Sequence, residues 1–249
     1  MDKKLRLVDE APDWLVVDKP PHVAIHPSKP GETGTVWNLL KEVLAYEVVN
    51  GGQVSIINRL DRDTSGLVLV AKTASAARRF CKAMERREFH KEYTAVVAGW
   101  PADDYYEIDA PLCRQGLHMP SRVWVRQIVH PAGAQAATRV SVERRFRRPD
   151  GAPFAIVRAE PLTGRMHQIR VHLAHIGHPV VGDKIYGPGE EFYLRFIETG
   201  WTPELERALL LPRQALHSSL LRLEGDPRLE WRSPFPADLR EWVDHNLLV

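Results

Sequence analysis

The 249-residue sequence contains few cysteines and no long hydrophobic run. Its two cysteines, Cys81 and Cys113, form no CxxC pair and no disulfide framework, which is typical of a protein from a reducing cytosol. The N-terminal segment MDKKLRLVDE has no apolar core, so that we do not expect it to be a signal peptide. No apolar run reaches the roughly 18 residues that a membrane helix needs. We therefore expect a soluble, cytoplasmic protein.

The net charge is also small, at +2 with histidine neutral, so that the overall charge indicates no partner. The basic residues, however, are concentrated in two clusters, ARRFCKAMERREFHK (77–91) and ERRFRR (143–148). A solvated surface would explain one such cluster. Two clusters on either side of a candidate site favour a polyanionic partner, because arginine and lysine make most contacts to nucleic-acid phosphates.

The length suits one large domain or two small lobes. Apolar periodicity and turn residues predict strands at 14–20, 66–72, 92–100, 137–146 and 154–162, helices at 35–46, 74–88 and 166–177, and a late hairpin over 216–234. Residues 101–134 show no clear pattern. Because strands and helices are mixed without a regular βαβ alternation, we expect an α+β fold.

Two of these predicted helices are amphipathic. The apolar stripe predicted for 74–88 consists of Ala77, Phe80, Cys81 and Met84, and its basic face of Arg78, Lys82 and Arg86. In 166–177 the predicted apolar stripe is Ile169, Leu173 and Ile176. Arg170 lies off this stripe, so that it is either solvated or presented toward a cleft.

The segment INRLDRDTSGLVLVAKT (57–73) places Asp61 between Arg59 and Arg62. Two nearby guanidinium groups stabilise the ionised form of a carboxyl group, and an ionised, shielded carboxylate can serve as a nucleophile or a base. If 57–61 is extended, Arg59 and Asp61 project to the same side while Leu60 faces the core. The alternative interpretation is an ordinary ion pair in a surface loop.

Two further patterns could indicate a metal site. Asp61 and Asp63 form a DxD pair of the kind that binds a metal and a nucleotide sugar in some glycosyltransferases. His167, His172, His175 and His178 crowd one segment. No Gly-rich phosphate loop accompanies the first pattern, and no HExxH motif or neighbouring cysteine accompanies the second. The sequence therefore favours packed or surface histidines over a metal centre.

The motifs, taken in order, resemble those of the RluA-type pseudouridine synthases. The central motif of that family is Arg-Leu-Asp, two variable residues, Thr-Ser-Gly and an apolar strand, which matches 59–72. A Lys-x-Tyr-x-Ala strand matches KEYTA (91–95), and a longer motif matches LTGRMHQIRVHLAHIGHPVVGDKIYG (162–187). The segments VVDKP and LHSSL near the two ends of the chain also match, so that the resemblance spans nearly the whole sequence.

This resemblance implies an enzyme that isomerises uridine in RNA by breaking the C1′–N1 bond and rejoining the base through C5. It implies that Asp61 is the catalytic aspartate and that Arg170 holds Asp61 in an ion pair. It also implies that Tyr93 stacks on the base and that Arg59 fills the gap left by the flipped nucleotide. The remaining residues expected to bind substrate are Arg62, Arg165 and His167. No cofactor and no metal is implied, because substrate and product are isomers.

The fold implied by the resemblance is a mixed, mostly antiparallel sheet split between two lobes, with the RNA cleft between them. We expect residues 1–249 to form a single catalytic domain without an S4 module, with tRNA or rRNA as its partner and no obligate protein partner. The chain departs from the family pattern at Asn58, His22, Met166 and Gly225-Asp226, all outside the expected catalytic set. Two alternatives stay open: a non-catalytic RNA-binding protein on the same fold, and a metal-dependent enzyme.

Overall fold

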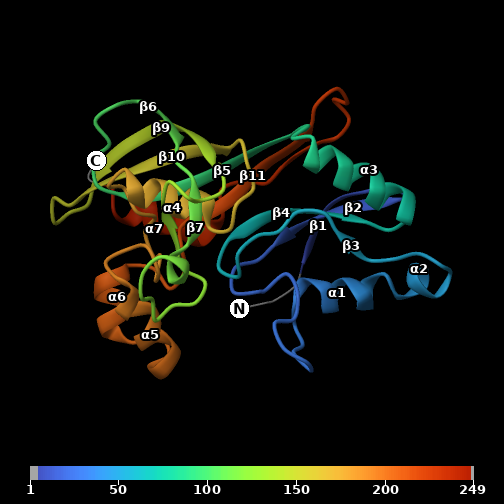
Figure 1. The fold of residues 1–249 in the computed structure, drawn as a ribbon, viewed down its shortest axis with the longest axis horizontal. Helices are drawn as coiled ribbons and strands as arrows, with labels where there is room; N and C mark the ends of the chain where they lie inside the picture. Colours follow the sequence, from blue (N-terminus) through green and yellow to red (C-terminus); the bar gives the residue numbers. More distant parts are fainter. Residues whose placement is uncertain (1–4, 248–249) are drawn as a thin grey trace. The chain divides into compact units, whose positions relative to one another are not determined.

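The computed structural model describes residues 5–247, and the chain folds into two compact units (Figure 1). The first unit contains the residues up to Lys91 together with His217–Pro234. The second contains Glu92–Leu216 and the residues from Phe235 onward. Two strands, β5 (Phe89–Ala98) and β11 (Leu216–Leu223), begin in one unit and end in the other.

The first unit is built around β4 (Ser65–Ala71), whose seven residues are all buried. The strand order is β1-β2-β4-β11, with β3 paired to β4 and β12 paired to β11. Their bounds are β1 Arg6–Glu10, β2 Trp14–Lys19, β3 Ser55–Ile56 and β12 Glu230–Arg232. The pair β4–β11 is parallel, whereas β1–β2, β2–β4, β3–β4 and β11–β12 are antiparallel. The continuous apolar run SGLVLVA thus forms a central strand, as its composition predicts.

Helices cover both sides of these strands: Figure 1 shows α3 (Ala74–Glu85) on one side and α1 (Val36–Val43) on the other. The helix predicted over 35–46 is interrupted at Leu44, and α2 (Ala45–Val49) follows it. Phe80 of α3 packs in one buried cluster with Leu67 and Leu69 of β4. Trp14 and Trp231 belong to the same cluster and meet edge to face, with ring centroids 5.1 Å apart.

The apolar stripe predicted for α3 is partly wrong. Its buried residues are Ala76, Phe80 and Ala83, while Ala77 and Met84 are only partly buried and Cys81 is exposed. Ala76 and Ala83 lie four residues before and three residues after Phe80, on the same face of the helix, so that the buried face is rotated away from Cys81. The predicted basic face is confirmed, because Arg78, Lys82 and Arg86 are exposed.

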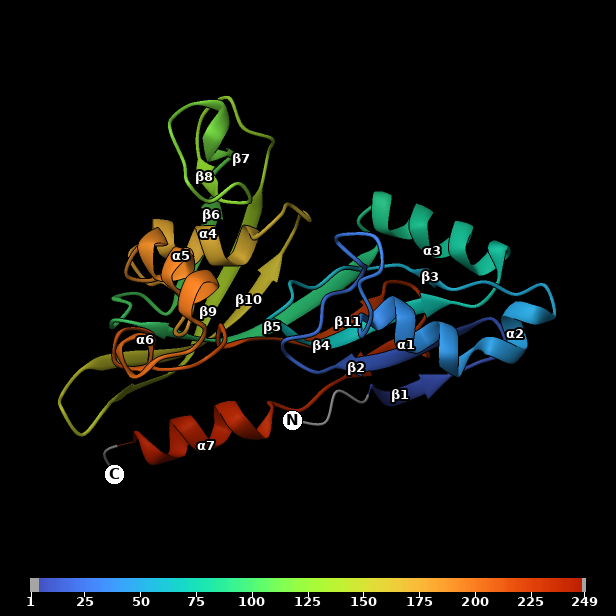
Figure 2. The same cartoon turned by 90° about the horizontal axis from the view of Figure 1, so that it is seen from below.

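The second unit contains an antiparallel arrangement of strands in the order β5-β10-β9-β6 and a separate pair, β7–β8. Their bounds are β6 Tyr105–Asp109, β7 Leu112–Arg114, β8 Gln127–Val129, β9 Ala137–Arg147 and β10 Pro153–Pro161. Its helices are η1 Gln115–Leu117, α4 Gln168–His175, α5 Glu190–Thr199, α6 Pro203–Leu209 and α7 Ala237–His245. In Figure 2 the β7–β8 segment extends away from β9 and β10 of the same unit.

The predicted α+β class and mostly antiparallel sheet are confirmed. The predicted hairpin over 216–234 is also present as β11 and β12, and Gly225 in its turn has φ +82°. None of the helices within residues 5–247 is long and apolar enough to cross a bilayer.

Candidate active site

Asp61 lies in the loop between β3 and β4 and is half-buried. Leu60 is buried, as the extended-chain prediction requires, whereas Arg59 and Arg62 are exposed. The amide of Thr64 donates to the Asp61 carbonyl over 3.1 Å and closes the turn behind the carboxylate. The Asp61 carboxylate is therefore presented from a short turn, and the buried side chain of Leu60 anchors this turn in the core.

A buried lysine holds the backbone of this loop. The Lys19 side chain is fully buried, and its Nζ donates to the carbonyl oxygens of Pro20 (3.0 Å), Val23 (2.9 Å) and Arg62 (3.0 Å). An ammonium group has three N–H donors, and these three carbonyls can accept all of them. Lys19 thereby ties the turn after β2 to the residue that follows Asp61.

The turn after β2 contains His22 where the resembled family has glycine. His22 adopts φ +65°, and its Nδ1 lies 3.2 Å from Oδ1 of Asp63. The left-handed turn is therefore retained without glycine. Within the part of the chain that the structure describes, Asp61 and Asp63 belong to no group of three or more possible metal ligands. This gives the DxD interpretation no support.

The strand behind Asp61 is fixed by close contacts with β11 and with Asn58. A Cβ atom on Gly66, which has φ +116°, would lie 2.3 Å from the Ser218 carbonyl oxygen, so only glycine allows the two strands to approach. The buried Ser65 Oγ lies 2.9 Å from Nδ1 of His217. Asn58 bonds to the backbone of β4 at both ends of its amide, accepting from the Leu69 amide and donating to the Leu67 carbonyl.

The other two residues expected to be catalytic lie in the second unit. Tyr93 is in β5, opposite Ala159 of β10, and its exposed fraction is 9%. Arg170 is in α4 and is buried, so the solvated alternative for this residue is wrong. Its guanidinium group lies 5.0 Å from the centroid of the Tyr186 ring. The predicted ion pair between Arg170 and Asp61 stays a prediction.

The structure gives Arg170 a strong partner within its own unit. Its Nε and Nη2 atoms donate to the two carboxylate oxygens of Asp183 over 2.6 and 2.9 Å. Asp183 is completely buried and also accepts from the amides of Ile185 and Tyr186. Burial alone would raise the pKa of Asp183, but the charge of Arg170 and these four hydrogen bonds hold that pKa below its usual value. The bidentate pair therefore fixes the orientation of Arg170.

The loop before α4 carries Arg165 and His167. Arg165 is exposed, and its Nε donates to the Gln135 carbonyl over 3.1 Å. His167 adopts φ +56°, and its Nδ1 lies 2.8 Å from the Tyr186 hydroxyl. Gln168, which is buried, bonds to Thr163, to the Arg165 amide and to β9, and so anchors the start of α4.

Two of the histidines in this segment, His172 and His175, differ in their burial. His172 is fully buried, with Nδ1 2.9 Å from Thr138 Oγ1 and Nε2 2.9 Å from the Ala110 carbonyl. Burial lowers the pKa of His172, and the bond to Ala110 opposes this only partly. His175 is exposed. Neither residue belongs to a group of three possible metal ligands among residues 5–247.

Comparison with known families decides among the interpretations. Residues 13–175 match the family model described as RNA pseudouridylate synthase. The chain belongs to this family. It is therefore an RNA pseudouridine synthase, an enzyme that isomerises uridine in RNA, and the RluA-type resemblance is confirmed.

Curated relatives and solved structures agree with this family. The synthase is 36% identical over 250 residues to "Ribosomal large subunit pseudouridine synthase D" of Shigella flexneri, an alignment that covers 98% of this chain and 71% of that protein. It is 33% identical to the protein of the same name from Haemophilus ducreyi, over 96% of this chain and 70% of the relative. The structure of human RNA Pseudouridylate Synthase Domain Containing 1 matches with a TM-score of 0.72 at 26% identity, covering 99% of this chain and 91% of that one.

A second human structure, RNA Pseudouridylate Synthase Domain Containing 4, matches with a TM-score of 0.70. At 19% identity, with 96% of this chain and 92% of that chain covered, it shows that the fold is shared.

Several buried residues that support the candidate site could not be singled out from the sequence. Lys19, Gln168 and Asp183 are buried polar groups that fix Asp61 or Arg170, and all three lie inside segments that resemble the family. Polar residues next to an apolar run are a weak signal by themselves. The groups that bond to Lys19, Gln168 and Asp183 are either distant in the sequence or are backbone atoms, which no sequence motif reveals. The structure is therefore needed to identify these three residues.

Proposed function

We propose that this synthase uses Asp61 as its catalytic aspartate. The observation that carries the proposal is that Asp61, in its family motif, is half-buried on a turn held by the fully buried Lys19. A fixed and partly shielded carboxylate is suited to act on a bound nucleotide. Attack on the sugar, attack on the base and proton abstraction from the ribose each require Asp61 to be ionised.

The reaction breaks the C1′–N1 bond, forms a bond between C1′ and C5, removes the hydrogen from C5 and adds one to N1. We assign Tyr93 to stacking on the uracil ring and to assisting removal of the C5 proton. We assign Arg170 to stabilising the charge on Asp61. A guanidinium group has five N–H donors, so the Nε and Nη2 bonds to Asp183 are compatible with a further carboxylate partner.

The residues proposed to bind RNA outside the reacting nucleotide are Arg59, Arg62, Arg165 and His167. The three arginines are exposed, which suits contact with phosphate or with the gap left by a flipped base. His167 is bound to the Tyr186 hydroxyl, and we propose that it shapes the RNA-facing loop before α4. Contact by several cations predicts that RNA affinity falls steeply with salt.

We propose ribosomal RNA of the large subunit as the target, ahead of tRNA. The support is the name shared by relatives that are 33–36% identical over at least 96% of this chain. We further propose that residues 1–249 act as one catalytic domain, located in the cytoplasm, with RNA as the partner and no obligate protein partner. The family motifs in both units support the assignment to one domain.

The target is tested with unmodified transcripts of large-subunit rRNA and of tRNA, incubated separately with the protein. Pseudouridine is then mapped by chemical labelling and primer extension. Modification of defined positions in rRNA alone supports the proposed target. Modification of tRNA alone contradicts the target while leaving the isomerase activity intact. Binding without modification in either RNA would instead favour the non-catalytic alternative.

A further inference from the structure

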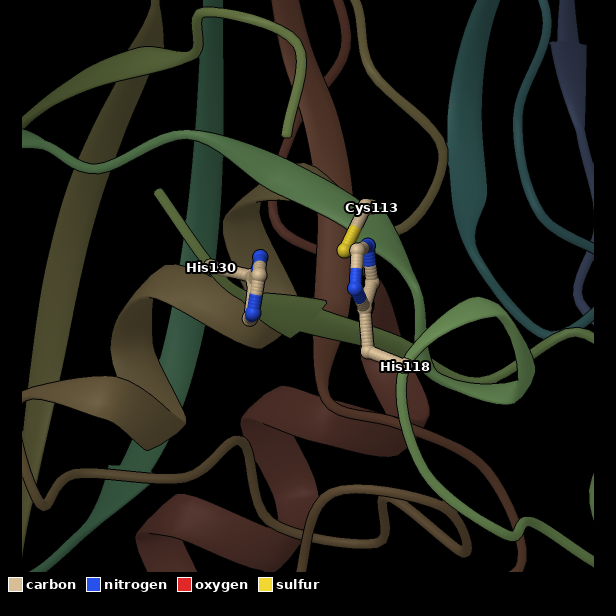
Figure 3. Close-up of side chains that lie close together, drawn as sticks. All are labelled: Cys113, His118 and His130. Atoms are coloured by element: carbon tan, nitrogen blue, oxygen red, sulfur yellow. The ribbon is translucent and has the colours of Figure 1, made fainter. Parts of the chain in front are cut away.

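Cys113, His118 and His130 come together in the second unit (Figure 3). Cys113 is in β7, His118 directly follows η1 and His130 directly follows β8. The Cys113 Sγ and one ring nitrogen of each histidine all lie within 4.8 Å of one another. These three side chains lie outside the group assigned to catalysis or RNA binding, and no predicted element covered them.

Strand pairing and backbone hydrogen bonds hold the backbone around this cluster in place. Cys113 is paired with Ile128 in the β7–β8 ladder. The His130 amide donates to the Pro111 carbonyl over 2.9 Å, and the His118 amide donates to the Gln115 carbonyl over 2.9 Å. The three side chains therefore originate from three separate points of the segment and converge because the ladder and η1 fold it back on itself.

We propose that Cys113, His118 and His130 bind a zinc ion. A thiolate and two imidazoles match the ligand preference of Zn²⁺, and three protein ligands leave a fourth position for water or an external ligand. With Zn–S near 2.3 Å and Zn–N near 2.0–2.1 Å, tetrahedral ligand atoms lie about 3.4–3.6 Å apart. The observed upper limit of 4.8 Å is larger by about 1.2–1.4 Å, a difference that rotation of the side chains can close.

Two features of the cluster define what must change when the metal binds. The rings of His118 and His130 are stacked, with centroids 3.9 Å apart and planes inclined by 21°, so they must turn until their nitrogens converge. The Nδ1 of His130 accepts a hydrogen bond from the Ala132 amide over 3.2 Å. That bond is lost whether Nδ1 binds the metal or Nε2 binds it and Nδ1 carries the proton. The Cys113 thiol releases its proton to solvent as the Zn–S bond forms.

Zinc bound here would link β7, η1 and β8 across the loop between Cys113 and His130. This loop contains Trp124, whose exposed fraction is 75%, with the Arg114 guanidinium 3.7 Å from the ring centroid. It also contains the exposed Arg122, a site for trypsin. The metal is therefore expected to add a cross-link to a segment that the two short strands, the buried Val123 and the bond from the Gln127 amide to the Tyr186 hydroxyl already hold.

The test uses the full chain purified without a polyhistidine tag. Zinc content is measured directly, and Zn²⁺ and Co²⁺ affinities are measured by titration against a competing chelator. The ligand variants are Cys113→Ser, His118→Asn and His130→Asn. The matched controls are Cys81→Ser and His175→Asn, which remove an exposed cysteine and an exposed histidine elsewhere. His118 is exposed, so its variant is expected to fold, and circular dichroism checks this for all five.

We expect one zinc per chain, and a Co²⁺ complex that shows a thiolate charge-transfer band and the intense d–d absorption of tetrahedral coordination. Removing a residue that only hydrogen-bonds to a metal ligand weakens metal binding about 10- to 100-fold. Removing a ligand itself should cost more, so we expect each ligand variant to lose at least about 100-fold in metal affinity. The controls should bind as the wild type does. Zinc should also slow tryptic cleavage after Arg122 in the wild type and shift the Ala132 amide resonance.

Two results would overturn the proposal. One is the absence of Zn²⁺ and Co²⁺ binding by the wild type at micromolar metal. The other is binding that the three ligand variants retain as fully as the two controls do.

Discussion

Replacing Asp183 by asparagine should destabilise the synthase because it removes the negative charge of a buried carboxylate that accepts two hydrogen bonds from the buried Arg170. Both side chains of this pair are buried, and two hydrogen bonds of 2.6 and 2.9 Å join them. Asparagine can still accept from the Ile185 and Tyr186 amides, so the loss is concentrated in the pair. Removing one partner of a buried ion pair costs about 3–5 kcal/mol. For a chain of this size that corresponds to a fall in Tm of about 6–20 °C.

The assay is urea unfolding at neutral pH followed by circular dichroism, with thermal unfolding as a second measurement. The matched control is Glu107→Gln, which breaks the half-exposed pair with Arg139, where the charges are 3.8 Å apart. An exposed pair of this kind contributes at most about 1 kcal/mol. A loss for Asp183→Asn that is no larger than the loss for Glu107→Gln would refute the reasoning.

The pH dependence gives a second check on the same pair. Burial would raise the pKa of Asp183, but Arg170 and the backbone amides outweigh it and keep this pKa below its usual value. A carboxyl group with a lowered folded-state pKa contributes stability that is fully present above its unfolded pKa, about 3.9, and is lost as the pH falls through the folded-state pKa. The stability difference between wild type and Asp183→Asn should therefore be constant from pH 8 to about pH 5 and shrink below about pH 4.

Three further predictions follow from single residues. Gly66→Ala should cost at least about 2 kcal/mol of unfolding free energy, because its Cβ would lie 2.3 Å from the Ser218 carbonyl oxygen. The control Gly151→Ala, at φ +84° in open space, should cost about 1–2 kcal/mol. Equal losses for the two variants in urea unfolding would contradict this. His172→Gln should reduce the loss of stability as the pH falls below about 6.5. Burial lowers the pKa of His172, so that in the wild type the unfolded chain takes up this proton at a higher pH than the folded chain does; an unchanged pH profile of stability would count against it. Tyr93→Phe should keep RNA affinity and lose turnover. Tyr93→Leu should also lose about 1–3 kcal/mol of RNA-binding free energy in a filter-binding assay. Full turnover by the phenylalanine variant would contradict the assigned proton-transfer role.

The parts of the fold that the sequence predicts well depend on local patterns. The continuous apolar run before Ala71 predicts the buried strand β4, and the turn residues near Gly225 predict the late hairpin. The buried stripe of α3 is predicted less well, because alanine and cysteine are similar in polarity. In the structure Ala76 and Ala83 are buried and Cys81 is exposed. The sequence pattern therefore predicts that one face of this helix is buried, but it does not fix which of two neighbouring rows of residues forms that face.

The parts that the sequence does not predict depend on distant contacts. The strands β7 and β8 are three residues each and are joined by a long loop, so neither has a recognisable period. The same closure brings Cys113 next to His130, which no spacing rule identifies. Arg170 is recognised from its motif, but its Asp183 partner and its burial follow from how α4 packs.

The most direct test of the central claim is release of tritium from RNA that carries 5-³H-uridine. Wild type, Asp61→Asn and the matched control Asp63→Asn are compared on ribosomal and transfer RNA, because joining C1′ to C5 must expel that hydrogen. We expect release by wild type and by Asp63→Asn, and a loss of about 10⁴-fold or more in Asp61→Asn with RNA binding retained. Substantial release by Asp61→Asn would contradict the assigned role of this carboxylate. No release by the wild type from either RNA, with binding intact, would contradict catalysis on these substrates.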